Sequence, residues 1–287
     1  MSLQPLAYLD PRFLETVEGR PVRILSEYLE PLRRFKEQKI QDTVVFFGSS
    51  RVDSRQRAER AMKTLRSRGV SGADEQYEKE LLKSRKAVEW ARYYEEAREL
   101  ARMLTTWSSS LDTDNHRFVV TSGGGPGIME AANRGAHEAG GKTIGLNIRL
   151  PYEQGANKYI SEGLHFEFHY FFMRKFWFAY LASAIVVFPG GFGTCDEMFE
   201  ILTLAQTDKL SKRTQVVLYG REYWNQILNL APMEEWGAIA SQDLELMQHA
   251  DTPAEAFGHL QSHLIGHHLQ PATAQESEAP GLAKTKG

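Results

Sequence analysis

Short apolar runs rich in β-branched and aromatic residues alternate with longer helical patterns along most of this chain. Six of the runs are expected to be strands, at residues 43–47, 118–121, 142–146, 164–168, 184–188 and 215–219. The patterns that separate the later runs predict helices at residues 127–139, 169–182 and 194–207. Strands that alternate with helices favour a parallel sheet covered on both faces. The predicted fold class is therefore α/β, with a parallel sheet between two layers of helices.

The segments on either side of this pattern define the domain organisation. Residues 1–40 mix prolines with charged amphipathic pieces, which predicts a helical N-terminal extension. Residues 41–268 are expected to form a single domain that ends in helices from about residue 222. Residues 271–287 are rich in Pro, Ala, Ser and Lys, a composition typical of a disordered tail.

A long charged insertion, which is expected to be helical, separates the first two predicted strands, at about residues 51–110. Its first part, residues 51–74, is rich in Arg with Ser and Gly breaks, and we interpret it as a surface connection. An apolar stripe at helical spacing then runs from Glu75 to about Trp107 and predicts one long helix.

The charge balance and the cysteine content restrict the partners and the compartment. A net charge of −3 provides no general attraction for nucleic acid. The most apolar stretch, residues 166–189, is interrupted by Glu167, Arg174 and Lys175, which makes it a poor membrane span. Cys195 is the only cysteine, so the chain cannot form an internal disulfide. We therefore expect a cytoplasmic protein with no membrane and no nucleic-acid partner.

Three predicted strands end in loops of small residues, namely Gly48-Ser49-Ser50, Gly123-Gly124-Gly125-Pro126-Gly127 and Gly190-Gly191-Phe192-Gly193-Thr194. Glycine lets the backbone approach a ligand closely, and a helix N-terminus offers free N–H groups that favour a phosphate. A single loop of this kind is more often required for packing alone. Several of them at the carboxyl edge of one sheet indicate a phosphate-binding site.

The spacing of the glycines disfavours two common nucleotide-binding motifs. In the dinucleotide pattern G-x-G-x-x-G, the third glycine would fall on Ile128 in one loop and on Asp196 in the other. The P-loop pattern fails because Lys142 comes one residue late and precedes a predicted strand instead of following one. An NAD enzyme and a P-loop NTPase are both less favoured for this reason.

The most specific string is Pro189-Gly190-Gly191-Phe192-Gly193-Thr194-Cys195-Asp196-Glu197. One interpretation is a capping box, in which Thr194 caps the helix and Glu197 reaches back to the cap. The other is catalytic, because carboxylates one turn from a phosphate loop would repel the ligand unless they had a chemical task. Cys195 lies in the first turn of the same helix, where its pKa is expected to be lowered.

This string, preceded by Met173-Arg174-Lys175, resembles the Lonely Guy (LOG) family of nucleoside 5′-monophosphate phosphoribohydrolases. The segments Gly123–Glu130 and Gly48–Ser50 match the family too, and the resemblance covers roughly residues 42–230. It implies a Rossmann-like fold, a homodimer or larger homo-oligomer, and no metal or redox cofactor. It also implies an N-glycosidase of the EC 3.2.2 type, which releases a free base and ribose 5-phosphate. Many members carry the label lysine decarboxylase, but nothing in these residues predicts a pyridoxal phosphate site.

The resemblance assigns roles to individual residues. Glu197 and Arg174 would be the catalytic pair, because a carboxylate stabilises the positive charge that develops on the sugar, and a guanidinium can hold a phosphate or orient the carboxylate. The nucleotide-binding residues would be Ser49, Gly124, Gly125, Glu130, Asn133, Lys175, Gly191, Gly193 and Thr194. Of these, Glu130 and Asn133 are predicted either to face the ribose or to be surface residues of their helix.

Two functions from different classes remain open at this point. The first is hydrolysis of an AMP-like nucleotide, with a cytokinin riboside monophosphate as one option for the substrate. The second is a non-catalytic carrier or sensor that binds a nucleotide or molybdenum cofactor in the same crevice. The aromatic run at residues 171–178 is interpreted as core or dimer surface and not as a contact to the base. The sequence leaves the preferred base, the oligomer size and the function of the extension and insertion undetermined.

Overall fold

Seven strands form one parallel sheet in the order β4-β3-β2-β1-β5-β6-β7. The computed structural model describes residues 4–67, 75–150, 155–210 and 212–269. The strands are β1 (Thr43–Phe47), β2 (Val119–Ser122), β3 (Thr143–Ile148), β4 (His165–Phe168), β5 (Ala182–Val187), β6 (Gln215–Tyr219) and β7 (Met247–Ala250). The predicted α/β class and the six predicted strands are confirmed.

β7 lies where the sequence predicts only helices. It pairs with β6 at the edge of the sheet, and Ala250 is its one buried residue. An edge strand of this kind needs no long β-branched run, so the pattern does not reveal it. The helical prediction after residue 222 is therefore wrong at β7 and holds for α8 (Arg221–Ile227), α9 (Ala231–Glu235), η2 (Ser241–Leu246) and α10 (Pro253–His268).

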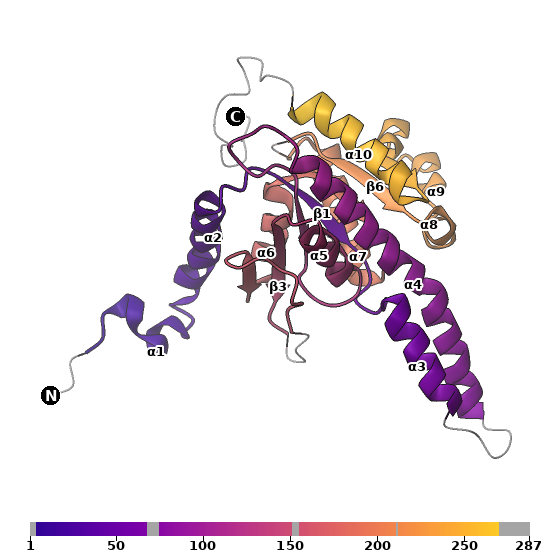
Figure 1. Cartoon of the computed structure of the whole chain (residues 1–287). Coiled ribbons are helices and arrows are strands. Elements are labelled where there is room, and N and C mark those ends of the chain that lie inside the picture. The colour runs from indigo at the N-terminus through magenta and orange to yellow at the C-terminus, as the bar shows by residue number, and fades with distance from the viewer. Residues whose placement is uncertain (1–3, 68–74, 151–154, 211, 270–287) are drawn as a thin grey trace.

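Helices cover both faces of the sheet (Figure 1). They include α2 (Arg20–Glu37), α4 (Glu75–Ser108), α5 (Ile128–Glu138), α6 (Phe171–Tyr180) and α7 (Phe192–Gln206). Successive side chains of a strand point to opposite faces. Val44 and Phe46 of β1 accordingly pack with α4, α5 and α10, whereas Val45 and Phe47 pack with α2, α6 and α7. None of the helices in the described residues is long and apolar enough to cross a membrane.

The order of the strands reverses between β1 and β5. The chain runs outward from β1 through β2 and β3 to β4, and then returns to the other side of β1 to continue through β5, β6 and β7. Beyond the ends of these two central strands, the amide of Phe188 donates to the carbonyl of Phe47 at 2.8 Å, and the amide of Ser49 donates to the carbonyl of Pro189 at 3.0 Å. Ligands of open α/β sheets bind at such a reversal.

The N-terminal extension packs on the domain through α2, with η1 (Ala7–Leu9) and α1 (Pro11–Leu14) before it. The indole Nε1 of Trp177 in α6 donates to the carbonyl of Glu27 at 2.9 Å. The Glu27 carboxylate accepts the amides of His169 (2.7 Å) and Tyr170 (3.2 Å), which lie at the N-terminus of α6. A carboxylate at this end of a helix is favoured by the helix dipole. The extension thus fixes the start of α6.

The insertion forms a hairpin of two helices, α3 (Arg55–Ser67) and α4, that extends beyond the sheet (Figure 1). Residues 55–67 of the predicted surface connection lie at the surface and form a helix, while 68–74 lie outside the described residues. α3 buries a single residue, Ala58, and packs along α4 instead of on the sheet. Its apolar residues Ala58, Met62 and Leu65 recur at helical spacing, but the row is short and lies among charged residues. The predicted tail also lies outside the described residues.

Candidate functional site

A cavity of about 890 Å³ opens at the carboxyl ends of β1, β2 and β5, where the strand order reverses. Its floor consists of the three glycine loops, at residues 48–51, 123–125 and 190–197. Its walls are formed by Trp90, Met129, Asn147, Ile148, Leu150, Phe171, Arg174, Phe178, Tyr223 and Ile227. The volume lies within the range of small-molecule sites, about 300–1,000 Å³. The three loops predicted from the sequence therefore meet in one cavity.

The loop after β5 leads into α7 without a side-chain cap. α7 begins at Phe192, two residues earlier than predicted, and its N-cap is Gly191. The amide of Thr194 donates to the carbonyl of Gly191 at 3.0 Å, so Thr194 already lies inside the first turn. The capping-box interpretation is therefore wrong, and Glu197 is not engaged in capping the helix.

Two glycines of this loop are not explained by packing. A Cβ atom added at Gly191 or Gly193 would have no atom within 4 Å, whereas one added at Gly190 would lie 2.1 Å from the Oγ1 atom of Thr194. Among the described residues, the amides of Phe192 and Gly193 have no acceptor. Open space above free amides at a helix N-terminus suits an anionic group.

In the triple-glycine loop, by contrast, packing requires glycine. Gly124 has a φ of +74°, and a Cβ atom there would lie 1.9 Å from the Oδ1 atom of Asn147. A Cβ atom at Gly123 would lie 2.4 Å from the Nη2 atom of Arg174. Gly123 and Gly125 line the cavity, while Gly124 lies behind them. This loop seats two side chains of the cavity wall.

Glu197 is buried in the wall of the cavity, with 8% of its surface exposed. Burial raises its pKa to about 7, Lys175 and Arg174 oppose this shift, and Glu200 and Asp196 add to it. A carboxyl group with such a pKa can hold or release a proton at neutral pH, which is a property of catalytic acids and bases.

Arg174 reaches the cavity from α6. Its Nε atom donates to the carbonyl of Leu146 at 2.7 Å, and its guanidinium lies 5.0 Å from the ring centroid of Phe178. Burial lowers its pKa, and the charge of Glu197 opposes this shift. An arginine remains charged in a protein, so this is a fixed cation that interacts with Glu197 inside the cavity.

Lys175 does not line the cavity. Its Nζ atom lies 2.8 Å from Asp196, 2.8 Å from Glu200 and 4.0 Å from the Oε2 atom of Glu197. It neutralises the acidic first turns of α7, and the predicted contact to a nucleotide is not supported by this geometry.

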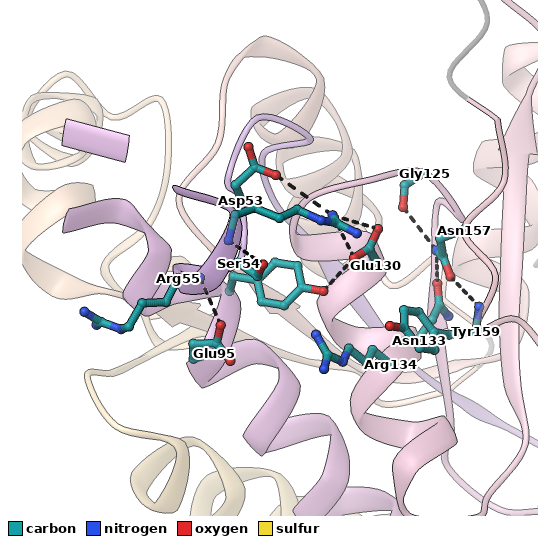
Figure 2. A network of polar contacts seen from close by, with 12 residues as sticks. Asp53, Ser54, Arg55, Glu95, Gly125, Glu130, Asn133, Arg134, Asn157 and Tyr159 are labelled. Carbon is teal, nitrogen blue, oxygen red and sulfur yellow. Dashed lines mark hydrogen bonds and ion pairs between the residues drawn. The ribbon is translucent and has the colours of Figure 1, made fainter. Parts of the chain in front are cut away.

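The structure does not bring Glu130 and Asn133 to the cavity either. Both are buried on α5, so the predicted surface location is wrong as well. The Glu130 carboxylate accepts a hydrogen bond from the hydroxyl of Tyr94 at 2.7 Å and pairs with Arg57 at 3.0 Å (Figure 2). The carboxamide of Asn133 binds residues of the neighbouring strands.

Asn147, Tyr223 and Trp90 are among the cavity residues that the sequence did not reveal. Asn147 lies at the end of β3 and its Oδ1 atom, buried in the wall, has no donor among the described residues. The hydroxyl of Tyr223 donates to the carbonyl of Gly190 at 2.7 Å. Trp90 comes from the insertion and contacts the ring of Tyr223 at a centroid distance of 5.5 Å. Only Asn147 had a signal in the sequence, as a polar residue at the carboxyl end of a predicted strand.

Cys195 also lines the cavity and is partly buried. Burial raises the pKa of its thiol, which is opposite to the shift expected from its place near a helix N-terminus. A thiol with a raised pKa is a poor nucleophile at neutral pH.

The raised pKa of Glu197 predicts how stability depends on pH. The native state holds the Glu197 proton more tightly than the unfolded state, in which the pKa of this carboxyl group is 4.5. The free energy of unfolding of wild type therefore falls as the pH rises from 4.5 to about 7. Glu197→Gln has no carboxyl group to titrate, so its free energy of unfolding should rise relative to that of wild type over this pH range. The relative gain should reach about 3 kcal/mol above pH 7. Urea denaturation at several pH values measures the difference.

Glu99→Gln is the matched control for this experiment. Arg102 holds the pKa of Glu99 below its usual value, so its carboxylate stabilises the native state at higher pH and this contribution is lost on acidification. The two variants should therefore change with pH in opposite directions. A pH-independent difference between Glu197→Gln and wild type would contradict the buried, protonatable carboxyl group.

Comparisons with known proteins found a matching family model and similar solved structures. Residues 129–260 match the family model described as possible lysine decarboxylase. Among solved structures, the Moco carrier protein from Chlamydomonas reinhardtii is 24% identical over 61% of this chain and 89% of its own, with a TM-score of 0.42. The structural-genomics target TM1055 is 20% identical over 77% of this chain and 99% of its own, with a TM-score of 0.45. Among curated proteins none matches.

The matched region contains part of the sequence that carries the resemblance, while Gly48–Ser50 and Gly123–Ile128 lie before it. It starts at Met129, directly after the triple-glycine loop, and includes Arg174 and the whole string from Pro189 to Glu197. The match to the family model described as possible lysine decarboxylase, a label that many LOG proteins carry, supports the resemblance of this chain to the LOG family.

Proposed function

We propose that this protein hydrolyses the N-glycosidic bond of a nucleoside 5′-monophosphate to a free base and ribose 5-phosphate. The observation that carries this proposal is the carboxyl group of Glu197, buried in the cavity wall with a pKa of about 7. It lies on the first turns of α7, close to a helix N-terminus with free amides and on the same cavity as Arg174.

The 5′-phosphate is assigned to the N-terminus of α7. Phe192, Gly193 and Thr194 line the cavity, and the amides of Phe192 and Gly193 have no acceptor among the described residues. Gly193 has no Cβ that could obstruct a ligand. Ser49 and Gly125 lie across the floor and would complete the binding site. Helix dipole and free amides favour a phosphate dianion here.

Glu197 would then act on the sugar. Breaking the bond from C1′ to the base nitrogen builds positive charge on the ribose, which a nearby carboxylate stabilises. The same carboxylate can accept a proton from the attacking water. The water supplies the hydroxyl of ribose 5-phosphate and, through Glu197, the proton that leaves with the base. Arg174, fixed by the carbonyl of Leu146, would keep Glu197 oriented and its charged form populated.

A non-catalytic carrier is the second candidate, and the size of the cavity favours it. At about 890 Å³ the cavity is near the upper end of small-molecule sites and would hold a ligand larger than a mononucleotide. A carrier of a phosphorylated cofactor would use the same amides at α7. It would have no chemical use for Glu197, and this separates the two candidates.

Turnover of nucleotides tests the proposed hydrolysis directly. Purified protein incubated with AMP, GMP, IMP, CMP, UMP and a cytokinin riboside monophosphate should release base and ribose 5-phosphate from at least one of them. Glu197→Gln should lower the rate at least about a hundredfold, because general base and charge stabilisation are both lost. Chromatography of the products measures both effects and identifies the preferred base.

Two controls make the result interpretable. Glu99→Gln changes an exposed carboxylate of α4 in the same way and should keep the wild-type rate. The nucleoside that corresponds to the best substrate should react much more slowly, because phosphate binding lowers the barrier at the sugar. Thermal stabilisation by a nucleotide without release of any base would favour the carrier.

A substitution at Gly193 tests whether the phosphate binds at the N-terminus of α7. Gly193→Ala adds a methyl group to the first turn of α7, where it meets no protein atom. It should leave the protein as stable or stabilise it by about 0.4–1 kcal/mol, yet weaken nucleotide binding at least tenfold. Gly258→Ala is the matched control, because its Cβ would also lie in open space within a helix, far along the chain in α10. Equal nucleotide affinity of both variants, measured by calorimetry, would exclude the α7 site.

We also propose that the protein is a homodimer or a larger homo-oligomer. Phe171 and Phe172 of α6 are 53% and 49% exposed, and Phe192 at the start of α7 is 97% exposed. Exposed aromatic residues close to a cavity are typical of a surface that another chain covers. The free cysteine fits the cytoplasmic location that we expect.

The exposed phenylalanine rings predict the oligomeric state and the effect of a charge placed among them. Light scattering after gel filtration should give a mass of at least twice the 32.6 kDa of one chain. Phe172→Glu should shift the mass toward the monomer, whereas Trp236→Glu, at an 88% exposed aromatic residue elsewhere, should not. A monomeric wild type would contradict the proposal.

A further inference from the structure

Asn157 contacts the triple-glycine loop from behind the cavity. Its amide donates to the carbonyl of Gly124 at 2.8 Å. Its side-chain Nδ2 atom donates to the carbonyls of Gly124 (3.0 Å) and Gly125 (3.1 Å), as Figure 2 shows in part. The carbonyls of Gly124 and Gly125 therefore point toward Asn157, and Asn157 itself does not line the cavity.

The carboxamide of Asn157 is locked in this orientation. Its Nδ2 atom also lies 2.9 Å from the Oδ1 atom of Asn133, so its two hydrogens are shared among three acceptors. Its Oδ1 atom accepts the amide of Tyr159 at 3.1 Å (Figure 2). The carboxamide of Asn157 therefore uses both its NH2 group and its oxygen. A rotation that exchanged Nδ2 and Oδ1 would lose the hydrogen bonds of both groups.

Asn133 is fixed in turn by the sheet. It is fully buried, and its Nδ2 atom donates to the Oγ1 atom of Thr143 (2.6 Å) and the carbonyl of Ile144 (3.0 Å). Its Oδ1 atom accepts the hydroxyl of Ser122 at 2.7 Å, and the same hydroxyl oxygen accepts the amide of Gly124 at 3.1 Å. The chain of bonds from β3 through Asn133 to Asn157 therefore ends on the glycine loop.

The orientation of the Gly124 carbonyl determines where the next amide points. In a planar trans peptide, the C=O and N–H groups point in opposite directions. With the carbonyl of Gly124 held toward Asn157, the N–H of Gly125 points to the opposite side, where Gly125 lines the cavity. Pro126 follows and has no N–H, so Gly125 is the last residue before Gly127 that can donate.

We propose that Asn157 is a positioning residue, which holds the loop so that the N–H of Gly125 binds an anionic oxygen of the nucleotide. The identity of the ligand rests on the proposed function, whereas the geometry of the loop does not. This role also explains the buried Asn133, which orients Asn157 and does not reach the cavity.

The experiment compares Asn157→Asp and Asn157→Ala with wild type. Asp keeps the shape but replaces the donor by an oxygen that repels both glycine carbonyls, so the loop should turn. Ala only removes the bonds. AMP binding by calorimetry should weaken at least tenfold for Asp and less for Ala, with KM raised more than kcat is lowered. Asn115→Asp, which introduces the same charge at an exposed site, should bind AMP like wild type.

A second measurement needs no ligand. In hydrogen exchange of the free protein, the amide of Gly124 should exchange at least tenfold faster in Asn157→Asp than in wild type, while α10 stays protected. If the variants show wild-type exchange in this loop, or if Ala impairs binding more than Asp, the positioning role is overturned and Asn157 only fills space. If wild type binds AMP without releasing base, the proposed hydrolysis fails, and the positioning role is still decided by exchange and affinity.

Discussion

The pairing of β1 with β5 is the constraint on which the rest of the site depends. The register places Phe47 opposite Val187, so that the loops after both strands leave the sheet side by side. Ser49 then joins all three loops, because its amide donates to the carbonyl of Pro189 and its carbonyl accepts the amide of Ile128 at the start of α5. A parallel sheet cannot shift its register without moving every buried side chain, so the geometry of the cavity floor is fixed by the core.

The burial of Glu197 opposes stability, and the surrounding charges only partly offset it. Lys175 reaches the acidic turns of α7 from outside the cavity, and Arg174 acts from inside. Both cations come from α6, whose N-terminus is held by Glu27 of the extension. A buried carboxyl group with a raised pKa, on α7, that is offset by cations of α6, which α2 in turn holds in place, is typical of a functional site. The N-terminal extension thus contributes to the electrostatics of the cavity although it does not line it.

The sequence predicted the parts of the fold that depend on local patterns and missed those that depend on distant partners. Buried β-branched runs revealed six strands, but β7, with one buried residue, gave no such pattern. The positions of Glu130 and Asn133 on α5 were predictable from helical periodicity. What packs against them was not, since Tyr94 reaches Glu130 from a helix 36 residues earlier. The capping box failed for a related reason: it assumed that α7 begins at Thr194, and glycine allowed it to begin at Phe192.

The insertion determines more of the site than its charged sequence indicates. α4 contributes Tyr94, Leu100 and Leu104 to the core under the sheet, so the insertion is part of the domain and not an appendage. Trp90 of the same helix forms one wall of the cavity, and its ring meets Tyr223, which holds the carbonyl of Gly190. The wall and the glycine loop after β5 are therefore connected through one aromatic contact. Because Glu197 is fixed by α7 and Trp90 by α4, the width of the cavity between these two residues depends on how the two helices are placed.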